Sequence, residues 1–222
     1  MKKHLILVAG GTGTRMSSTL PKQFIEIGGT PVIVHTIKAF LAFDAEIMIT
    51  VVLPEAYFDT WHTIASHHPY IGKVQLVAGG ATRFQSVKNG LQTVSEDIGL
   101  VAVHDAVRPA IHPQIIHEAF ASAENNKAAI VCVALKDSIR KIQGQETVAQ
   151  DRADFLLVQT PQIFDTKVLK KAYLQEDSVQ FTDDASVVEA IGIKIAIVEG
   201  SYQNIKITTD EDLPVVSNYF KH

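Results

Sequence analysis

A glycine-rich segment that directly follows an apolar run holds the residues best suited to chemistry. Residues 5–8 are apolar, and residues 9–16 read Ala-Gly-Gly-Thr-Gly-Thr-Arg-Met. Glycines let backbone N–H groups approach phosphate oxygens without interference from a Cβ atom. Arg15 lies near the end of this segment and Lys22 follows soon after it, so two cations could neutralise a bound anion. The segment therefore predicts a nucleotide site.

Two familiar phosphate-binding loops do not match this segment. A P-loop closes on Gly-Lys-Ser or Gly-Lys-Thr, whereas Gly13 is followed by Thr14 and Arg15. A dinucleotide-binding loop has a third glycine, and this chain has Met16 at that position. A solvent-exposed glycine turn is the alternative interpretation. The two cations and the position after the first apolar run favour phosphate binding.

Charged residues also follow later apolar runs. Asp105 and Arg108 come after the run at 100–104, and Lys206 lies in the segment Asn-Ile-Lys at 204–206. A carboxylate at the end of a parallel strand is suited to Mg²⁺ beside phosphates, and an arginine can hold an anion through two N–H groups. Asp105 is therefore the predicted metal ligand. A surface ion pair between Asp105 and Arg108 is the alternative.

A second pair of glycines precedes another group of polar residues. Gly79 and Gly80 allow close approach of the backbone, and Arg83 and Ser86 follow at the start of a predicted helix. The amino terminus of a helix favours a bound anion. This segment is a further candidate for ligand binding.

The composition limits the classes of protein and of partner. The chain has 222 residues, of which 46% are hydrophobic, enough for one domain with a full core. Its net charge of −4 argues against binding to nucleic acid or to a membrane surface. Its one cysteine, Cys132, lies within an apolar run and is predicted to be buried in a protein of the reducing cytoplasm. Glycines interrupt the first apolar run after residue 9, so no export or membrane-spanning segment is expected.

Apolar runs alternate with helical patterns along the chain. The predicted strands are residues 5–8, 47–53, 74–77, 100–104, 128–133 and 193–198. Because most of these runs are continuously apolar, we expect strands covered on both faces in a mostly parallel sheet. One helix is predicted to begin at Pro31 with Thr30 as its cap, and others at Thr82, Pro113 and Thr182. The pattern predicts a doubly wound α/β fold, whose ligands bind at the carboxyl ends of the strands.

Residues 138–158 interrupt this alternation. Isolated apolar residues stand among charged and polar ones, with Gly144 in a predicted turn. This pattern indicates an antiparallel β-arm that protrudes from a single domain of residues 1–222. A two-stranded ribbon alone is only marginally stable in water. We therefore expect the arm to pack against another copy of the chain in a homo-oligomer, with a long solvated loop as the alternative.

Six motifs occur in the order found in one enzyme family. They are Ala-Gly-Gly-Thr-Gly-Thr-Arg-Met at 9–16, Pro-Lys-Gln-Phe at 21–24, Val-His-Asp-Ala-Val-Arg-Pro at 103–109, Thr-Pro-Gln at 160–162, Thr-Asp-Asp-Ala at 182–185 and Asn-Ile-Lys at 204–206. Together they resemble the 2-C-methyl-D-erythritol 4-phosphate cytidylyltransferases, from residue 5 to about residue 213. The resemblance implies a Rossmann-like nucleotidyltransferase fold and a magnesium-dependent enzyme. Such an enzyme joins CTP to 2-C-methyl-D-erythritol 4-phosphate in the non-mevalonate isoprenoid pathway.

The resemblance also implies roles for individual positions. Arg15, Lys22 and Lys206 match catalytic positions, the first two on the triphosphate and Lys206 on the α-phosphate. The positions implied for the nucleotide are Ala9, Gly10, Gly11, Thr12, Gly13, Gly80, Arg83, Ser86, Asp105 and Ala106, with Asp105 beside the magnesium. Those implied for the sugar-alcohol phosphate are Arg108, Ser138, Arg152 and Thr160, with the arm reaching across the dimer.

This chain departs from the family pattern at three places. Residues 8–11 read Val-Ala-Gly-Gly where the family often has Pro-Ala-Ala-Gly, and Ala81 stands where an acidic residue is common. A side-chain contact from position 81 to the nucleotide is therefore not expected, whereas backbone contacts survive. Ser138 replaces the more usual threonine and keeps the hydroxyl.

Two alternative functions are compatible with some of the motifs. Ribitol-5-phosphate cytidylyltransferases are similar in the same segments, but the spacing from Arg152 to Gln-Thr-Pro-Gln at 159–162 favours the methylerythritol enzyme. A nucleotide-binding regulator without catalysis is the second alternative. Such a regulator would have no reason to keep Lys22, Asp105 and Lys206 together.

Overall fold

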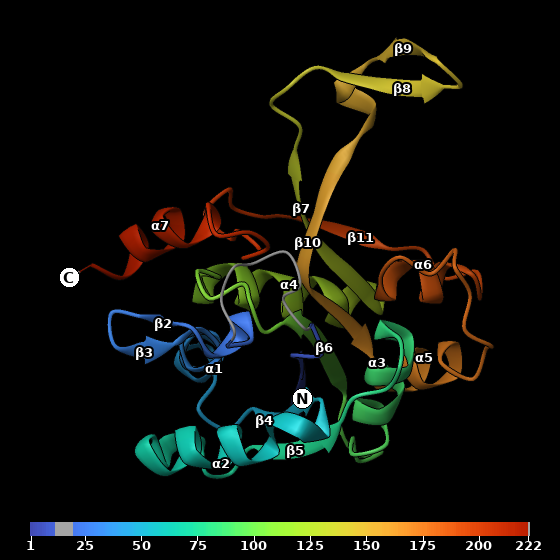
Figure 1. The fold of residues 1–222 in the computed structure, drawn as a ribbon. Helices are drawn as coiled ribbons and strands as arrows, with labels where there is room; N and C mark the ends of the chain where they lie inside the picture. The colour runs from blue at the N-terminus through green and yellow to red at the C-terminus, as the bar shows by residue number, and fades with distance from the viewer. Residues whose placement is uncertain (12–19, 222) are drawn as a thin grey trace.

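A seven-stranded sheet runs through the centre of the molecule (Figure 1). The computed structural model describes residues 1–11 and 20–221. In spatial order the strands are β11 (Ala196–Glu199), β7 (Ala128–Ala134), β10 (Leu156–Asp165), β6 (Leu100–Asp105), β1 (Lys3–Val8), β4 (Met48–Leu53) and β5 (Gln75–Ala78). Neighbouring strands pair in parallel except β10, which is antiparallel to both β6 and β7. The predicted mostly parallel sheet is confirmed.

Helices cover both faces of this sheet. One face carries α1 (Val32–Phe43), α2 (Phe58–His67) and α4 (Pro113–Asn126), and the other carries α3 (Arg83–Leu91), α5 (Thr166–Ala172) and α6 (Asp184–Glu189). Leu5 and Leu7 of β1 enter the first core and Ile6 enters the second, all without solvent exposure. Because side chains alternate across a strand, one continuous apolar run supplies both cores.

Smaller elements surround the sheet. The hairpin of β2 (Glu26–Ile27) and β3 (Thr30–Pro31) shares an apolar cluster with α7 (Asp212–Ser217). Single turns of 3₁₀-helix are η1 (Lys22–Phe24), η2 (Glu55–Tyr57), η3 (Pro69–Ile71), η4 (Arg152–Asp154) and η5 (Asn218–Phe220). Among the helices of the described chain, none has the length and apolar character that crossing a bilayer requires.

The predicted helix starts are partly confirmed. Thr82 caps α3, where its side chain accepts a hydrogen bond from the Gln85 N–H (3.1 Å), and Pro113 is the first residue of α4. The prediction of Thr30 as the cap of α1 is wrong. Thr30 pairs with Ile27 in the β2–β3 hairpin, which leaves Pro31 as the residue before the helix. The fourth helix, predicted to begin at Thr182, begins at Asp184 instead, with Asp183 as its cap.

Strand β10 is the main element that the sequence analysis does not predict. Its middle residues Gln159, Thr160 and Gln162 are polar, so the segment lacks the continuous apolar run of the other strands. All three are buried, and each is hydrogen-bonded to a neighbouring strand or loop or to α6. Tertiary contacts therefore override the local pattern. The strand predicted at 193–198 is also shorter than expected, since β11 begins at Ala196.

A two-stranded ribbon extends away from the body of the molecule (Figure 1). Its strands are β8 (Ile139–Gln143) and β9 (Glu146–Gln150), paired antiparallel around Gly144, whose φ is +64°. Residues 151–155 and the first part of β10 lead back to the sheet. Because the ribbon side chains are mostly exposed, its use in dimerisation stays a prediction.

Candidate active site

Two adjoining pockets lie at the carboxyl ends of β1 and β6. The glycine pocket, of about 330 Å³, is lined by the first glycine segment, by Lys22 and by the start of α3. The β10 pocket, of about 260 Å³, is lined by Arg108 and by residues of β10. Arg83, Asp105 and Lys206 line both pockets. Ligands of doubly wound sheets bind at this edge, so the two pockets form one candidate site.

The Asp105 carboxylate lies at the boundary between the pockets. Its Oδ2 accepts a hydrogen bond from Arg108 Nε (3.2 Å) and lies 3.0 Å from Lys206 Nζ. Burial alone would raise the pKa of this carboxyl, but the charges of Lys206, Arg83 and Arg108 together lower it, so the pKa lies well below its ordinary value. Asp105 is therefore an anion at neutral pH. The three surrounding cations leave an excess of positive charge, which suits a phosphate site.

The loop that carries Lys206 is fastened to β10. Asn204 is fully buried, and its Nδ2 donates to Gln159 Oε1 (3.0 Å) and to the Thr160 carbonyl (2.8 Å). Gln159 donates in turn to a carbonyl of the same loop (2.9 Å), and the Asn204 carbonyl accepts from Arg108 Nη1 (2.8 Å). These bonds fix Lys206 and Arg108 relative to each other. The sequence analysis includes Asn204 in a motif but assigns it no role.

The Thr160 hydroxyl is already engaged within the protein. Its Oγ1 accepts from the Asp105 N–H (3.1 Å) and lies 3.0 Å from His104 Nδ1. Burial lowers the pKa of His104 to about 3, so the ring is neutral. His104 Nε2 lies 3.2 Å from the Arg108 carbonyl, which can only accept, so Nε2 carries the proton and Thr160 donates to Nδ1. Thr160 thus orients residues 104–108, and its direct contact with a substrate phosphate stays a prediction.

The glycine pocket combines a cation with accessible backbone. Lys22 lies in η1, and the neighbouring Gln23 donates from Nε2 to the Ala9 carbonyl (2.9 Å), which fixes η1 against the end of β1. A Cβ atom on Gly11 would lie 3.6 Å from Lys22 Cε. The lysine stem therefore lies directly beside the glycine backbone, as a phosphate site requires.

The second glycine pair has a packing requirement of its own. A Cβ atom on Gly80 would lie 2.3 Å from Gln85 Cβ, so only glycine fits. Ser86 Oγ accepts from the Gly80 N–H (3.0 Å) and donates to the Thr82 carbonyl (2.9 Å). These bonds shape the turn before α3, and they bring Gly80 and Ser86 to the glycine pocket.

Arg83 reaches the boundary between the pockets from α3. Its Nη2 donates to Asp184 Oδ2 (2.5 Å), and the Tyr173 hydroxyl donates to Asp184 Oδ1 (2.6 Å). Asp184 and Tyr173 are buried, and the sequence analysis predicts neither as a functional residue. Asp184 belongs to the motif Thr-Asp-Asp-Ala, which is the signal that could have identified it. No pattern in the sequence distinguishes Tyr173.

The structure brings most of the predicted site residues together and separates a few. The glycine pocket is lined by the predicted residues Ala9, Gly10, Gly11, Lys22, Gly80, Arg83, Ser86, Asp105 and Lys206, and the β10 pocket by Arg108 and Thr160. Ala106 is fully buried behind both pockets, where its N–H donates to the Val8 carbonyl (3.0 Å). Ser138 and Arg152 lie near the exposed ribbon and line neither pocket. Thr12, Gly13 and Arg15 lie outside the described residues.

The carboxylate of Asp105 fits a magnesium ion that is shared with a nucleotide. Within residues 1–11 and 20–221, no three histidine, cysteine or acidic side chains group together in a way that could hold a metal alone. Mg²⁺ commonly takes one or two carboxylates and completes its shell with water and substrate phosphates. Lys206 and Arg108 contact Oδ2 of Asp105, and the described side chains form no hydrogen bond to Oδ1. This oxygen is the one suited to the metal.

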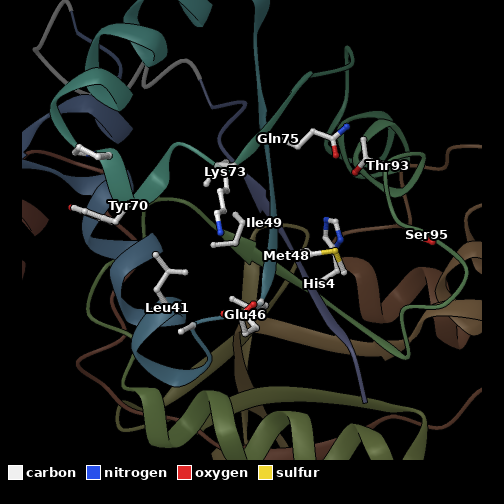
Figure 2. Close-up of a pocket in the computed structure, with 14 residues that line it drawn as sticks. His4, Leu41, Glu46, Met48, Ile49, Tyr70, Lys73, Gln75, Thr93 and Ser95 are labelled. Carbon is white, nitrogen blue, oxygen red and sulfur yellow. The ribbon is translucent and has the colours of Figure 1, made fainter.

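A larger cavity, of about 570 Å³, lies at the opposite edge of the sheet (Figure 2). It is lined by the first residues of β4 and β5 and by segments beside α1 and α3, with His4, Glu46 and Lys73 among its titratable side chains. Burial lowers the pKa of His4 to about 4, so this ring is neutral at pH 7. The described residues that line the cavity form no ion pair with one another. The carboxyl edge, where charged side chains do pair across the pockets, is therefore the candidate active site.

Known proteins resemble the chain over its whole length. The sequence profile of the 2-C-methyl-D-erythritol 4-phosphate cytidylyltransferases matches residues 3–222. A protein of that name from Bacteroides thetaiotaomicron is 47% identical over 219 residues, which cover 98% of this chain and 99% of the relative. The crystal structure of 4-diphosphocytidyl-2C-methyl-D-erythritol synthase from Anaerococcus prevotii has a TM-score of 0.84 and 30% identity, and the match covers 100% of this chain and 96% of that one. The cytidylyltransferase structure from Thermus thermophilus has a TM-score of 0.78, 29% identity and 98% coverage of both chains.

Proposed function

The chain belongs to the 2-C-methyl-D-erythritol 4-phosphate cytidylyltransferase family, and we propose that its reaction takes place where the glycine pocket meets the β10 pocket. It is a nucleotidyltransferase that joins CTP and 2-C-methyl-D-erythritol 4-phosphate to give 4-diphosphocytidyl-2-C-methyl-D-erythritol and pyrophosphate. The observation that supports the location is that Arg83, Asp105 and Lys206 line both pockets. A nucleotide in one pocket and an acceptor phosphate in the other would meet at these side chains.

The transfer requires orientation and positive charge more than a base. An oxygen of the acceptor phosphate attacks the α-phosphorus of CTP and forms a new P–O bond. The bond from the α-phosphorus to the bridging oxygen breaks, and pyrophosphate leaves with that electron pair. The second pKa of a phosphate monoester is about 6, so the attacking oxygen is already anionic at neutral pH. The barrier lies in bringing anions together, and fixed cations lower it.

The proposed roles follow the positions of the cations. Lys22, beside the glycine backbone, would bind the triphosphate, and Lys206, at the boundary, would stabilise charge on the α-phosphate. Arg108, in the β10 pocket, would hold the acceptor phosphate. Mg²⁺ would be held by Asp105 and the CTP phosphates, where it supplies further charge neutralisation. Arg15 keeps its predicted role on the triphosphate.

Neither alternative function is favoured. The relatives and solved structures described above carry the methylerythritol name and not the ribitol one. A regulator without catalysis is not favoured either, because the curated relatives are named as enzymes over nearly the whole length of this chain.

The direct test is pyrophosphate release from CTP with each acceptor. With Mg²⁺ present, we expect rapid release with 2-C-methyl-D-erythritol 4-phosphate and little with D-ribitol 5-phosphate. Removal of the metal with EDTA should stop release, and an excess of Mg²⁺ should restore it. Equal or faster release with the ribitol phosphate would overturn the assigned substrate. Release that is unaffected by EDTA would overturn the proposed metal.

We further propose that the protein acts as a homodimer whose arms complete the site. Ile142 and Val148 of the ribbon are 75% and 43% exposed, and residues 155–158 are between 42% and 51% exposed. Apolar residues gathered in this way commonly mark an interaction surface. Ser138 and Arg152, which line neither pocket of their own chain, would then reach the acceptor pocket of the partner subunit.

Mixing two inactive variants tests this dimer. Arg152→Ala and Lys206→Ala should each be inactive alone, because both active sites of such a homodimer lack the substituted side chain. In a mixed dimer one site would contain both substituted residues and the other would contain neither. Random exchange of equal amounts should therefore restore about a quarter of the wild-type activity. If the mixture stays inactive although native mass spectrometry shows mixed dimers, Arg152 serves its own chain.

We also propose a cytoplasmic location. The one cysteine, Cys132, is a free thiol in a buried strand, and burial raises its pKa to about 11. Such an unreactive thiol fits a protein that needs no disulfide.

A further inference from the structure

We infer that Asp184, supported by Tyr173, is a positioning residue that holds the Arg83 guanidinium at the boundary of the two pockets. The inference rests on the proposed location of the transfer. Arg83 lines both pockets, and its side chain is 31% exposed, whereas the side chain of Asp184 is fully buried behind it. Asp184 would therefore influence the reaction through Arg83 and not by contact with a substrate.

Both oxygens of the Asp184 carboxylate are held. Arg83 Nη2 donates to Oδ2 (2.5 Å), and the Tyr173 hydroxyl donates to Oδ1 (2.6 Å). The Tyr173 ring stacks on Phe84, with ring centroids 4.6 Å apart and planes inclined by 25°. Phe84 is the residue next to Arg83 in α3. The same turn of α3 therefore carries Arg83 and the ring that fixes Tyr173. The carboxylate thus has one orientation available.

Strand β10 determines where Asp184 lies. Gln162 donates from Nε2 to Asp183 Oδ2 (2.8 Å) and accepts from the Ala185 N–H at Oε1 (2.9 Å). These bonds fix the chain on both sides of Asp184. Gln162 stands two residues after Thr160 and lines the β10 pocket. The wall of the acceptor pocket and the position of Arg83 are therefore set by one strand.

The remaining donors of Arg83 are available to a ligand. A guanidinium has five N–H groups, and in the described part of the chain the arginine side chain forms one hydrogen bond, the one to Asp184. Replacing a buried ion pair by apolar side chains is commonly neutral or stabilising, so stability alone does not account for this pair. Donors fixed in advance toward developing charge are effective in phosphate transfer. The pair is suited to that purpose.

Arg83 differs from the other two cations in what holds it. Lys206 and Arg108 both contact Asp105, the predicted magnesium ligand, whereas Arg83 is hydrogen-bonded to a carboxylate outside the pockets. A metal ion that bound Asp105 would weaken the hold on Lys206 and Arg108. Arg83 would keep its position, so at the boundary of the pockets the position of this cation would not depend on the metal.

A double-mutant cycle with Arg83 tests this role. Asp184→Asn keeps the size of the side chain and removes its charge, and it should lower kcat for pyrophosphate release about 10- to 100-fold. The KM for CTP should stay the same or fall, because the site loses a negative charge. In the Arg83→Ala background, the same substitution should change kcat by less than about 2-fold. All rates are divided by the folded fraction measured by circular dichroism. An equal loss in both backgrounds would show that Asp184 acts only through the fold and would overturn the inference.

Further variants keep the test decisive. If Asp184→Asn does not fold, Tyr173→Phe retains every charge and should lower kcat about 2- to 5-fold in the wild-type background and not at all with Arg83→Ala. An equal loss in both backgrounds would again overturn the inference.

Asp44→Asn, which removes the ion pair to Lys3 (2.8 Å) far from the pockets, is the matched control and should leave kcat unchanged. If Lys206→Ala keeps wild-type turnover, the proposed location is wrong, and the inference falls with it. If Lys206→Ala is inactive but Asp184→Asn leaves kcat unchanged, the proposed location stands and only the role of Asp184 is rejected.

Discussion

At the carboxyl edge of the sheet the charged side chains of the two pockets contact one another, whereas those lining the cavity at the opposite edge form no ion pair with one another. At the carboxyl edge, Lys206 and Arg108 meet the Asp105 carboxylate at 3.0 and 3.2 Å. At the amino-terminal edge, Lys73 and Glu46 line one cavity without pairing (Figure 2). The cavity there has a volume of about 570 Å³, and the two adjoining pockets of the carboxyl edge have about 330 and 260 Å³.

Cavity volume therefore does not distinguish the two edges, whereas the pairing of charged side chains within the cavities does. A buried carboxylate with three cations costs desolvation energy, and function accounts for that cost better than folding does. The amino-terminal edge carries a neutral buried ring, His4, and an amphipathic lining, which a folded sheet edge can contain without a role in catalysis. Substitutions of the same kind at the two edges should therefore have different effects.

The largest expected difference concerns one lysine from each edge. Lys206→Ala removes the cation that we propose stabilises the α-phosphate, and it should lower kcat about 10²- to 10³-fold. Lys73→Ala, at the other edge, should change kcat by less than about 2-fold. Steady-state pyrophosphate release at saturating substrates measures both. A similar loss from the two substitutions would remove the distinction between the edges.

A smaller difference is expected for two side chains that each form hydrogen bonds at one of the edges. Asn204→Ala removes two hydrogen bonds that hold the Lys206 loop, and should cost about 1–3 kcal/mol of unfolding free energy and lower kcat about 10-fold. Thr93→Val, at the other edge, removes the hydrogen bonds to Thr50 (2.8 Å) and to the Gly90 carbonyl (2.8 Å) and should cost about 1–2 kcal/mol with kcat unchanged. Urea unfolding and kinetics on the same samples separate the two effects. Full activity of Asn204→Ala would show that its loop does not position Lys206.

The smallest expected difference concerns pH. The pKa of His4 is about 4 in the folded protein and 6.5 when exposed, so below pH 6.5 the unfolded chain binds more protons. The stabilisation that is complete above pH 6.5 is lost as pH falls toward 4, by about 2 kcal/mol at pH 5. His4→Gln should remove this part of the acid loss and leave kcat at pH 7 unchanged. Urea unfolding of both proteins at pH 7 and pH 5 measures this loss of unfolding free energy. If the loss is the same in His4→Gln as in the wild type, His4 is not buried as a neutral ring.

His104 provides the matched variant at the carboxyl edge. Its pKa is lowered to about 3, so His104→Gln should also reduce the decrease in unfolding free energy between pH 7 and pH 5. Because His104 accepts from Thr160 beside the carboxylate, this substitution should also lower kcat. Equal kcat values for the two histidine variants would show that the Thr160 contact does not matter for the reaction.

The parts of the fold that depend on local pattern were predictable. Continuous apolar runs such as residues 5–8 identify strands buried on both faces, and Thr82 and Pro113 mark helix starts through their own backbone preferences. Strand β10 was not predicted, because its buried Gln159, Thr160 and Gln162 are satisfied by groups distant in sequence. Thr30 has the residue type of a cap but is used by a hairpin.

The same limit applies to the candidate site, where residues marked by a local motif were predictable and residues that act through packing were not. Local signals identify three of the residues: Lys22 follows the first glycine segment, Asp105 follows an apolar run, and Lys206 lies in the Asn-Ile-Lys motif. The topology of a doubly wound sheet brings such positions to one edge. Asp184 and Tyr173 lie behind the pockets, and their link to Arg83 depends on packing between α3, α5 and α6 that no local pattern contains. The inward turn of the Thr160 hydroxyl likewise depends on the tautomer of His104.

We propose that the reaction takes place at the carboxyl edge, between the two pockets. A crystal structure with Mg²⁺ and the product 4-diphosphocytidyl-2-C-methyl-D-erythritol would locate it. We expect the cytidine in the glycine pocket, the methylerythritol in the β10 pocket and the phosphate that was α in CTP in contact with Lys206. Product bound in the cavity beside His4 and Lys73, with the carboxyl edge empty, would contradict it.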